Sequence, residues 1–486
     1  MLQSKDIKNL SELKQSFVKS HKKPEFFLEF MNILKVGRLH AIFSNSKQKG
    51  ISSLHLIRLL LVFPFIDQKS VFSFTKSFWQ KFAGYGKDAY YRLKNNPRIN
   101  WRAFHFGIVK LMLKTIESRQ FEADNQSNAP KAFVFDDTVL PKTGKAIEGI
   151  SRIWDHVIHV SVLGFQLLVM GYYDGTMFMP INFSIHRSKG KNKNQPFGLK
   201  PKHYRKQYKK TRASNTAGYE RKKELDTSKI ESAVKMIITA VKQNFKAEYV
   251  LTDSWFTCWE LVDTTIKNGM TYIGMFSIVK TLFIYRNKEL SYGKIRRLNR
   301  KKIKRNRRFN IYYIRTVVEW KGQYVVLLFT RKGKNGKWKC LICTDLSLSV
   351  TKILEIYQIR WTIEVFFKEC KQSLGLGKSQ SNDFDAQIAD TTITMVQYLF
   401  LALRNRIDNY ETMGQLFNGT KDNLVKLSLH ERLIALLIAI IDIVVCLLDE
   451  DSDEETIMLK AINNDDALDK LLKLMDIHDV SMKHAA

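Results

Sequence analysis

The sequence predicts an α/β protein, in which a mixed-sheet core carries a β-rich insertion and is flanked by helical regions at both ends. Three observations predict this fold class. Apolar residues recur at helical spacing before residue 125 and again from about residue 349. Short apolar runs bounded by turn residues, typical of strands, fill 132–186 and 309–344. Between them, residues 228–276 alternate helical with strand-like sequence.

The charge balance predicts a polyanionic partner. The chain has 486 residues with 79 Lys and Arg against 47 Asp and Glu, a formal net charge of +32, and 45% hydrophobic residues that can fill a core. Nucleic acid satisfies such an excess best, because each phosphate contact releases condensed counterions. A ribosome-associated protein and a membrane-surface binder are the alternatives.

The five cysteines are odd in number and sparse, which indicates a reducing cytosol without a disulfide framework. Cys340 and Cys343 lie in an apolar run, so we interpret this pair as strand packing rather than a zinc site. The N-terminus has no signal-peptide core. The longest apolar stretch, 433–448, contains Asp442 and is shorter than the roughly 20 residues of a membrane span. We therefore expect a cytoplasmic, nucleoid-associated protein and no membrane partner.

Residues 1–125 form the first predicted region, which is helical. Helical spacing is clearest at 53–63 and 101–113, with basic residues between the apolar ones. We expect a helical DNA-binding region, and a helical cap on the core is the alternative.

Residues 126–279 form the first part of the predicted core. Three strand-like runs, at 132–137, 161–175 and 178–186, are followed by a helix at 228–244 and a strand at 248–253. A helix at 256–268 and a strand at 271–276 complete the set. Three strands, then helix, strand, helix, strand, is the element order of a ribonuclease H-like core.

Two basic segments interrupt or follow this core. Residues 187–223 hold 14 Lys or Arg and one acid, which predicts a flexible, solvated loop suited to a phosphate backbone. Residues 294–308 hold ten Lys or Arg in fifteen, within a β-rich insertion predicted at 280–345. A core helix at 346–390 and a helical C-terminal region at 391–486 complete the predicted organisation.

Three acids lie where phosphodiester chemistry would need them. Asp137 and Asp253 each end a predicted strand, and Glu364 lies on a predicted amphipathic helix. Cleaving and joining phosphodiesters requires a nucleophile, a stabilised leaving group and charge neutralisation, which two divalent ions supply together. Mg²⁺ prefers carboxylate oxygens. Asp136 precedes Asp137 and faces the opposite side of the strand, so it is the alternative first acid.

Four polar residues share one face of the predicted helix around Glu364. Tyr357, Arg360, Glu364 and Lys371 are spaced +3, +4 and +7. An Arg fork, a Lys charge and a Tyr hydroxyl suit DNA phosphates, while Glu364 suits a metal. An ordinary amphipathic helix with ion-paired polar residues is the alternative.

The spacing Tyr-x2-Arg-x3-Glu-x6-Lys resembles the signature of the insertion-sequence-4 family of bacterial DDE transposases. The family's Asp-Thr pair on the first strand resembles Asp137-Thr138, and its second acid, at the end of the fourth strand, resembles Asp253. A β-rich insertion between the second Asp and the Glu is also shared. The resemblance covers about 130–380 well, the N-terminal helices loosely, and the last hundred residues hardly at all.

The resemblance implies a DNA transposase that performs cut-and-paste transposition of an insertion sequence. Asp137, Asp253 and Glu364 would be the catalytic, metal-binding residues, with two Mg²⁺ (or Mn²⁺) ions per active site. Tyr357, Arg360 and Lys371 would contact DNA, as would Trp338 as a stacking platform for a flipped base, with Trp320 as its rival.

The resemblance also implies double-stranded DNA partners, namely terminal inverted repeats and target DNA, and a dimer in the synaptic complex. The apolar run at 433–448 is a candidate pairing element or an internal helix. A metal-dependent nuclease without strand transfer and a catalytically silent DNA-binding relative are the alternative functions.

Overall fold

The computed structural model describes residues 39, 41–44, 50–66, 68, 70–77, 85–118, 129–277 and 280–408. The chain divides into two compact units, and almost all described residues fall in the one formed by Met31–Pro64 and Gln68–Leu416. The predicted apolar run at 433–448 lies outside the described residues.

The described part of the N-terminal region is helical, as predicted. Its longest helix, α8 (Trp101–Ser118), packs against the C-terminal helix α16 (Phe384–Asp408) and against strand β4 (Phe178–His186). The apolar positions of α8 are buried, including Phe104 and Val109. The other elements before it are α3 (Ala41–Ser44), α4 (Ser53–Val62), η2 (Phe63–Ile66), α5 (Val71–Lys76) and α7 (Lys87–Lys94).

The predicted order of core strands and helices is confirmed. Strands β1, β3 and β4 are antiparallel neighbours, and β5 and β6 continue the sheet parallel to β1, giving the order β4-β3-β1-β5-β6. Helices α11 and α12 connect β4 to β5 and β5 to β6. The bounds are β1 (Ala132–Pro141), β3 (Val160–Tyr173), β5 (Tyr249–Thr252), β6 (Thr271–Phe276), α11 (Lys229–Lys242) and α12 (Trp259–Lys267).

One strand of this region was not predicted. Strand β2 (Ser151–Asp155) pairs with the first residues of β3 and lengthens that side of the sheet. Its residues alternate between buried and exposed, and the exposed positions include an aromatic residue, Trp154. A strand with an apolar residue on its solvent face lacks the polar alternation that identifies half-buried strands in a sequence.

The predicted strands at 309–319, 323–331 and 337–344 are confirmed within two residues at each end. They are β10 (Ile311–Trp320), β11 (Gln323–Lys332) and β12 (Lys339–Cys343). Because β12 pairs with β6, these strands extend the core sheet to twelve strands among the described residues. Cys340 and Cys343 are buried in β12 and unpaired, as the strand-packing interpretation requires. The remaining elements are β7 (Leu282–Tyr285), β8 (Lys288–Ser291), α13 (Tyr292–Leu298), η5 (Arg300–Lys302) and β9 (Lys304–Asn306).

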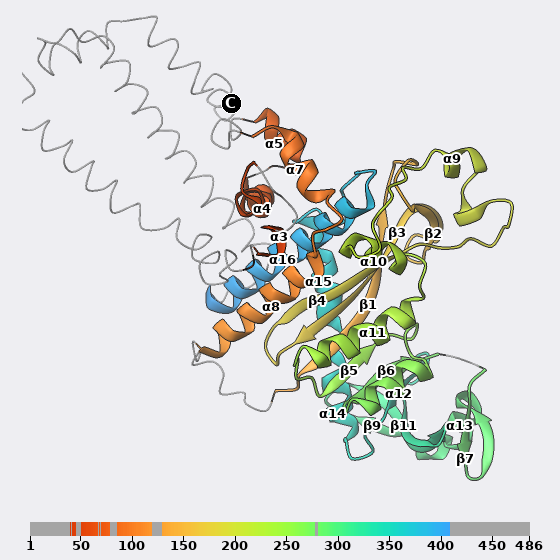
Figure 1. Cartoon of the computed structure of the whole chain (residues 1–486). Coiled ribbons are helices and arrows are strands. Elements are labelled where there is room, and N and C mark those ends of the chain that lie inside the picture. The colour runs from red at the N-terminus through yellow and green to blue at the C-terminus, as the bar shows by residue number, and fades with distance from the viewer. Residues whose placement is uncertain are drawn as a thin grey trace, which may run out of the picture. The chain divides into compact units, whose positions relative to one another are not determined.

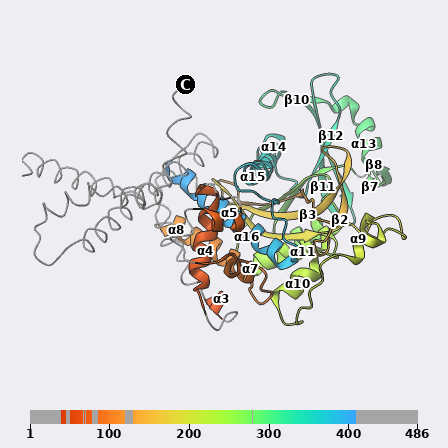
Figure 2. The same ribbon diagram turned by 90° about the horizontal axis from the view of Figure 1, so that it is seen from above.

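Helices cover both faces of the sheet. Helices α11 and α12 lie on one face, and α14 (Val350–Gln358) and α15 (Trp361–Gln372) lie on the other (Figures 1 and 2). Helix α15 packs on β1 and β4, and α14 packs on β6. The two faces of β1 therefore look toward different helices.

The prediction of a flexible, solvated loop at 187–223 is wrong for much of that segment. It contains η4 (Pro196–Gly198) and α9 (Pro201–Arg205), and α10 (Ala217–Glu224) begins within it. The side chain of Arg212 is 2% exposed and donates two hydrogen bonds to Glu148, at 2.9 and 2.7 Å. Arg212 also pairs with Asp385 at 3.1 Å, while Lys210 binds Asp383 and Asp385 at 2.7 and 2.8 Å. Acidic residues from distant parts of the chain pair with these two cations. Arg212 is therefore buried and Lys210 partly buried, although the composition of the segment predicts that they are exposed to solvent.

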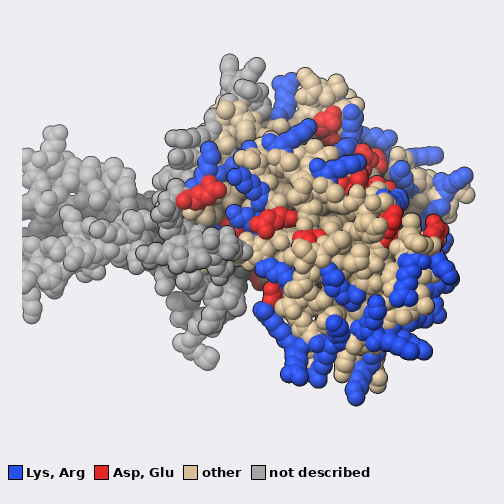
Figure 3. All heavy atoms as spheres, turned by 90° about the horizontal axis from the view of Figure 1, so that it is seen from below, with Lys and Arg blue, Asp and Glu red and all other residues tan. Residues whose placement is uncertain are grey.

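The other basic segment does lie at the surface. Most Lys and Arg side chains of 294–308 are exposed on α13, η5 and β9. Figure 3, viewed from the end of the molecule where α13 and β7 lie in Figure 1, shows Lys and Arg side chains crowded over this face. Acids lie across the middle of this view, whereas its lower part carries Lys and Arg with few acids between them, so that part of the surface attracts polyanions.

Candidate active site

Strands β1 and β5 bring two aspartates side by side. The two strands are parallel and Phe135 pairs with Thr252, so the next residues along each chain, Asp136 and Asp253, are neighbours. Parallel strands lie about 4.8 Å apart, and paired residues point to the same face. By strand register, Asp136 lies beside Asp253 and points to the same face of the sheet, whereas Asp137 lies one residue further along β1 and points to the opposite face.

The carboxyl group of Asp136 is buried beside other acids. Burial raises its pKa to about 7, and the nearby charge of Asp253 raises it further than any other residue does. The backbone N–H of Asp137 donates to Asp136 Oδ1 at 2.8 Å, which favours the charged form but does not offset burial. The pKa of Asp253 is also raised, chiefly by burial. Two desolvated carboxyl groups in this position attract a cation.

Arg360 links Asp136 to Glu364. Its guanidinium lies 3.6 Å from Asp136 Oδ2 and donates a hydrogen bond to Glu364 Oε1. The pKa of Tyr357 is raised to about 12, mainly by burial, and Asp253 and Asp136 both contribute. Asp136, Asp253, Glu364, Arg360 and Tyr357 therefore form one electrostatic cluster on the α14–α15 side of the sheet.

Asp137 faces the other side of the sheet. Its Oδ1 lies 3.0 Å from Nζ of Lys229, the first residue of α11. Lys229 also stacks 3.5 Å above the ring of Trp255, whose backbone N–H donates to Asp253 Oδ1 at 2.9 Å. Asp137 still acts on Asp253 through its charge. No sequence pattern pointed to Lys229 and Trp255, because neither lies in a recognisable spacing with the acids.

The single helix predicted around Glu364 is interrupted. Helix α14 ends at Gln358 and α15 begins at Trp361, and the residues between them form i→i−3 backbone bonds such as Arg360 to Tyr357. Both intervening residues keep right-handed helical angles, so the polar face continues across the junction. Tyr357 lies in α14 with its hydroxyl donating to the Thr252 carbonyl at 3.1 Å, which ties α14 to the end of β5.

Lys371 and Trp338 lie in different surroundings. Lys371 Nζ donates to Thr138 Oγ1 at 2.6 Å, and burial lowers the pKa of this lysine. Trp338 is half-buried, with the guanidinium of Arg331 4.7 Å from its ring centre. Trp320, the rival platform, is only 5% exposed and packs in the core against Trp259, so no base can reach its face.

Among the described residues, no three His, Cys, Asp or Glu side chains form a group able to hold a metal ion. The guanidinium of Arg360 stands between Asp136 and Glu364, where it supplies the positive charge that these acids need. The acids are therefore gathered around an arginine in this arrangement.

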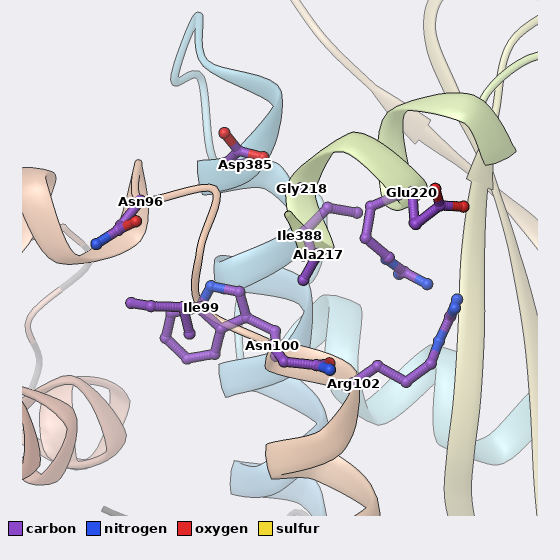
Figure 4. A pocket seen from close by; sticks show the side chains of 11 residues that line it. Asn96, Ile99, Asn100, Arg102, Ala217, Gly218, Glu220, Asp385 and Ile388 are labelled. Carbon is purple, nitrogen blue, oxygen red and sulfur yellow. The ribbon is translucent and has the colours of Figure 1, made fainter. Parts of the chain in front are cut away.

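A small cavity lies elsewhere in the same unit. Its volume is about 170 Å³, and its lining includes Trp101 and Arg221. Figure 4 shows Ile99 and Arg102 on one side of it and Gly218 and Asp385 on others. None of the three acids that cluster near Arg360 lines it. Arg102 pairs with Glu224 at 2.7 Å, which links α8 to α10, and Arg221 pairs with the same carboxylate at 2.9 Å within α10.

No helix in the part of the chain that the structure describes combines the length and apolar character needed to cross a membrane.

Comparison with known proteins identifies the class of chemistry. Residues 173–399, just under half of the chain, match the family model described as a transposase DDE domain. The matched stretch includes Asp253 and Glu364 but begins after β1. No curated protein matches the chain.

Among solved structures, the chain is similar to a piggyBac transposase in a synaptic complex with hairpin DNA, determined by cryo-electron microscopy. That match has 12% identity, a TM-score of 0.41, and covers 91% of this chain and 85% of that chain. Through the domain at 173–399, the protein is a DNA transposase.

Proposed function

We propose that this transposase belongs to the insertion-sequence-4 family and performs cut-and-paste transposition with a ribonuclease H-like core. The strand order β4-β3-β1-β5-β6, with β5 and β6 parallel to β1, supports this core. The Tyr357–Lys371 spacing supports the family. The proposed division is a helical DNA-binding region at 1–125, the core at 126–279 and 346–390, the insertion at 280–345 and a helical region at 391–486.

The observation that carries this proposal is the convergence of Asp136, Asp253 and Glu364 on one side of the sheet. Two of these acids are neighbours on parallel strands, and the third shares Arg360 with Asp136. We propose these three as the catalytic carboxylates. Asp137 was the predicted first acid, and its pairing with Lys229 on the opposite face favours Asp136 in that role.

Asp136, Asp253 and Glu364 would hold divalent cations only after Arg360 moves from between Asp136 and Glu364, since the described acids are not arranged as a metal site. Oxygen donors alone suit Mg²⁺, with Mn²⁺ as the alternative, and a cation beside Asp136 and Asp253 would offset the burial and the charge repulsion that together raise the pKa of Asp136. Two such ions, when bound, supply activation of the attacking oxygen and stabilisation of the leaving oxygen. Arg360 must then release Glu364, and its guanidinium becomes available to DNA.

Arg360, Lys371 and Trp338 are the proposed DNA contacts. Arg360 would pair with a backbone phosphate as a fork, and Lys371 would supply a point charge at the level of Thr138. The hydroxyl of Tyr357 would have to leave the Thr252 carbonyl to donate to a phosphate, so its first role is to position α14. Trp338, half-buried between basic side chains, would stack on an unpaired base.

The proposed substrates are the terminal inverted repeats of the element and a target duplex, held by two protomers in a synaptic complex. Cleavage at the element's end frees a 3′-hydroxyl, which then attacks a phosphodiester of the target. Each step is an in-line displacement at phosphorus, so one set of carboxylates serves all of them.

The test is a cleavage and strand-transfer assay with labelled end DNA, Mg²⁺ and a plasmid target. Glu364→Gln should lower cleavage more than about a hundredfold, which corresponds to roughly 2.7 kcal/mol of transition-state stabilisation, and leave end binding within about threefold. Glu369→Gln on the same helix is the matched control and should keep full activity. Cleavage by Glu364→Gln at the wild-type rate would refute the assignment.

The same assay separates the alternatives. A nuclease would cut the end DNA in a Glu364-dependent manner without joining it to the plasmid. A catalytically silent relative would bind the end DNA and release no cleaved strand in Mg²⁺ or Mn²⁺.

A further inference from the structure

The hairpin between β2 and β3 exposes an apolar tip. Val157 is 86% exposed and Ile158 57%, and Trp154 and Val160 are about half exposed beside them. Every residue from His156 to Ser161 is exposed. Exposing this much apolar surface opposes folding without improving the core, which marks the tip as a contact surface.

The tip is held in a defined shape. Asp155 Oδ1 accepts a hydrogen bond from the Val157 N–H at 2.8 Å, and His159 adopts φ 52° to bring the chain back into β3. A left-handed backbone at a non-glycine residue costs free energy that surrounding contacts must offset. The turn thus presents Val157 and Ile158 outward in a fixed arrangement, which lowers the ordering cost of a contact.

The hairpin projects from the catalytic end of the sheet. Pro141, the last residue of β1, pairs with Gly164, so β3 runs on beyond β1 toward the tip. Asp136 pairs with Val169 and Trp154 with Ser161, and both pairs lie on the same face because their β3 partners are an even number of residues apart. Eight residues at about 3.3 Å each make the path along β3 roughly 26 Å, and the direct distance is shorter because the charge of Asp155 reaches Lys371, which is bonded to Thr138 near Asp136.

Cations lie near the base of the hairpin. The exposed Arg152 precedes Trp154, and the basic segment that includes Lys189, Lys191 and Lys193 contacts β2 through Ser188 and η4, where Gly198 meets the Arg152 side chain, while Asp155 is the one acid in the tip. A symmetric dimer through this tip would press the same basic groups of two copies together. A polyanion with apolar interior surfaces satisfies both the cations and the apolar tip.

We propose that the tip Trp154–Val160 is a wedge that inserts apolar side chains between base steps of the element's end DNA. It would act within about eight base pairs of the cleaved phosphate, since the path of roughly 26 Å spans at most that many steps of about 3.4 Å. Wedges of this kind unstack a step and bend the duplex. The inference rests on the proposed cleavage site at Asp136, Asp253 and Glu364.

The test uses the full chain and a 40-base-pair duplex carrying the element's end, with 2-aminopurine at one position per duplex, in Ca²⁺. Wild-type protein should raise the fluorescence severalfold at a position within about eight base pairs of the cut and not at fifteen. The double variant Val157→Ser/Ile158→Ser should abolish that rise, and binding should change less than about threefold because the cations remain. Ile238→Ser/Val241→Ser, which alters two exposed apolar residues of α11, is the matched control and should leave the rise intact.

Three results would overturn the wedge. One is an unchanged fluorescence profile in the tip variant, and another is a rise confined to a labelled target duplex. The third is a loss of dimers on light scattering in the tip variant with the DNA signal intact, which would make the tip a protein contact. Cleavage in Mg²⁺ is measured in parallel, so a wild-type protein that cuts and joins DNA without any fluorescence rise refutes the wedge alone.

Discussion

Asp136 and Asp137 are adjacent in the chain, yet they belong to different surroundings. Alternation along β1 was foreseeable from the sequence and requires opposite faces for the two residues. Which face meets Asp253 depends on the pairing of Phe135 with Thr252, a contact across 117 positions that no local pattern specifies. The acids were therefore predictable as a group, and the choice between these two was not.

The two aspartates can be separated by substitution. Asp136→Asn should lower strand cleavage more than about a hundredfold, because it removes a carboxylate beside Asp253. Asp137→Asn should lower it less than about tenfold, because its main partner is Lys229. Single-turnover cleavage of labelled end DNA measures both, and thermal unfolding checks that both variants fold. The opposite ranking would restore Asp137 as the catalytic residue.

At the scale of elements, the sequence predicted those helices and strands whose apolar pattern and turn residues lie within the element itself. Strands β5 and β6 and helix α12 were located within about three residues, since their apolar runs and turn residues are local. The segment around Arg212 was misjudged, because its burial depends on Glu148, Asp383 and Asp385 from elsewhere in the chain. The junction at Arg360 was missed, because both residues there keep helical angles.

The Arg212 cluster yields a stability prediction. Arg212→Met leaves the buried carboxylates of Glu148 and Asp385 without their main partner, which should cost about 3–5 kcal/mol in the free energy of unfolding. Lys235→Met, which breaks an exposed pair with Glu231, is the control and should cost less than about 0.5 kcal/mol. Urea unfolding at pH 7.5 measures both. Equal losses would show that the cluster contributes no more than a surface pair.

His105 of helix α8 makes the free energy of unfolding depend on pH. This side chain is buried, its Nε2 has no hydrogen-bond partner, and burial lowers its pKa to about 4. The pKa of His105 in the folded state lies below its unfolded value near 6.5. The stability that the neutral side chain contributes is therefore complete above pH 6.5 and is lost as the pH falls toward 4.

Between pH 8 and pH 5 the loss from His105 should be about 2 kcal/mol. Urea unfolding across this range should therefore show a shallower pH dependence for His105→Leu than for wild type by that amount. His156→Gln, which alters an exposed histidine, should follow wild type. Parallel curves for wild type and His105→Leu would contradict the buried neutral histidine.

At the scale of the whole molecule, the sequence predicted the order of the core elements and the presence of a later set of strands. It did not predict that β12 pairs with β6, so that one sheet runs through the core and the strands after it. Pairing between Ile273 and Cys343 joins residues 70 positions apart, and only tertiary structure specifies such a pair. The basic face formed by 294–308 follows from composition once these strands hold the segment at the surface.

The central claim is that Asp136, Asp253 and Glu364 hold divalent ions when DNA is bound. Crystals of the full chain with end DNA and Mn²⁺, measured at the manganese absorption edge, test it directly. We predict two anomalous peaks within coordination distance of these three carboxylates, with Arg360 turned away from Glu364. Peaks that touch Asp137 in place of Asp136, or no peak near Asp253 and Glu364, would contradict the account.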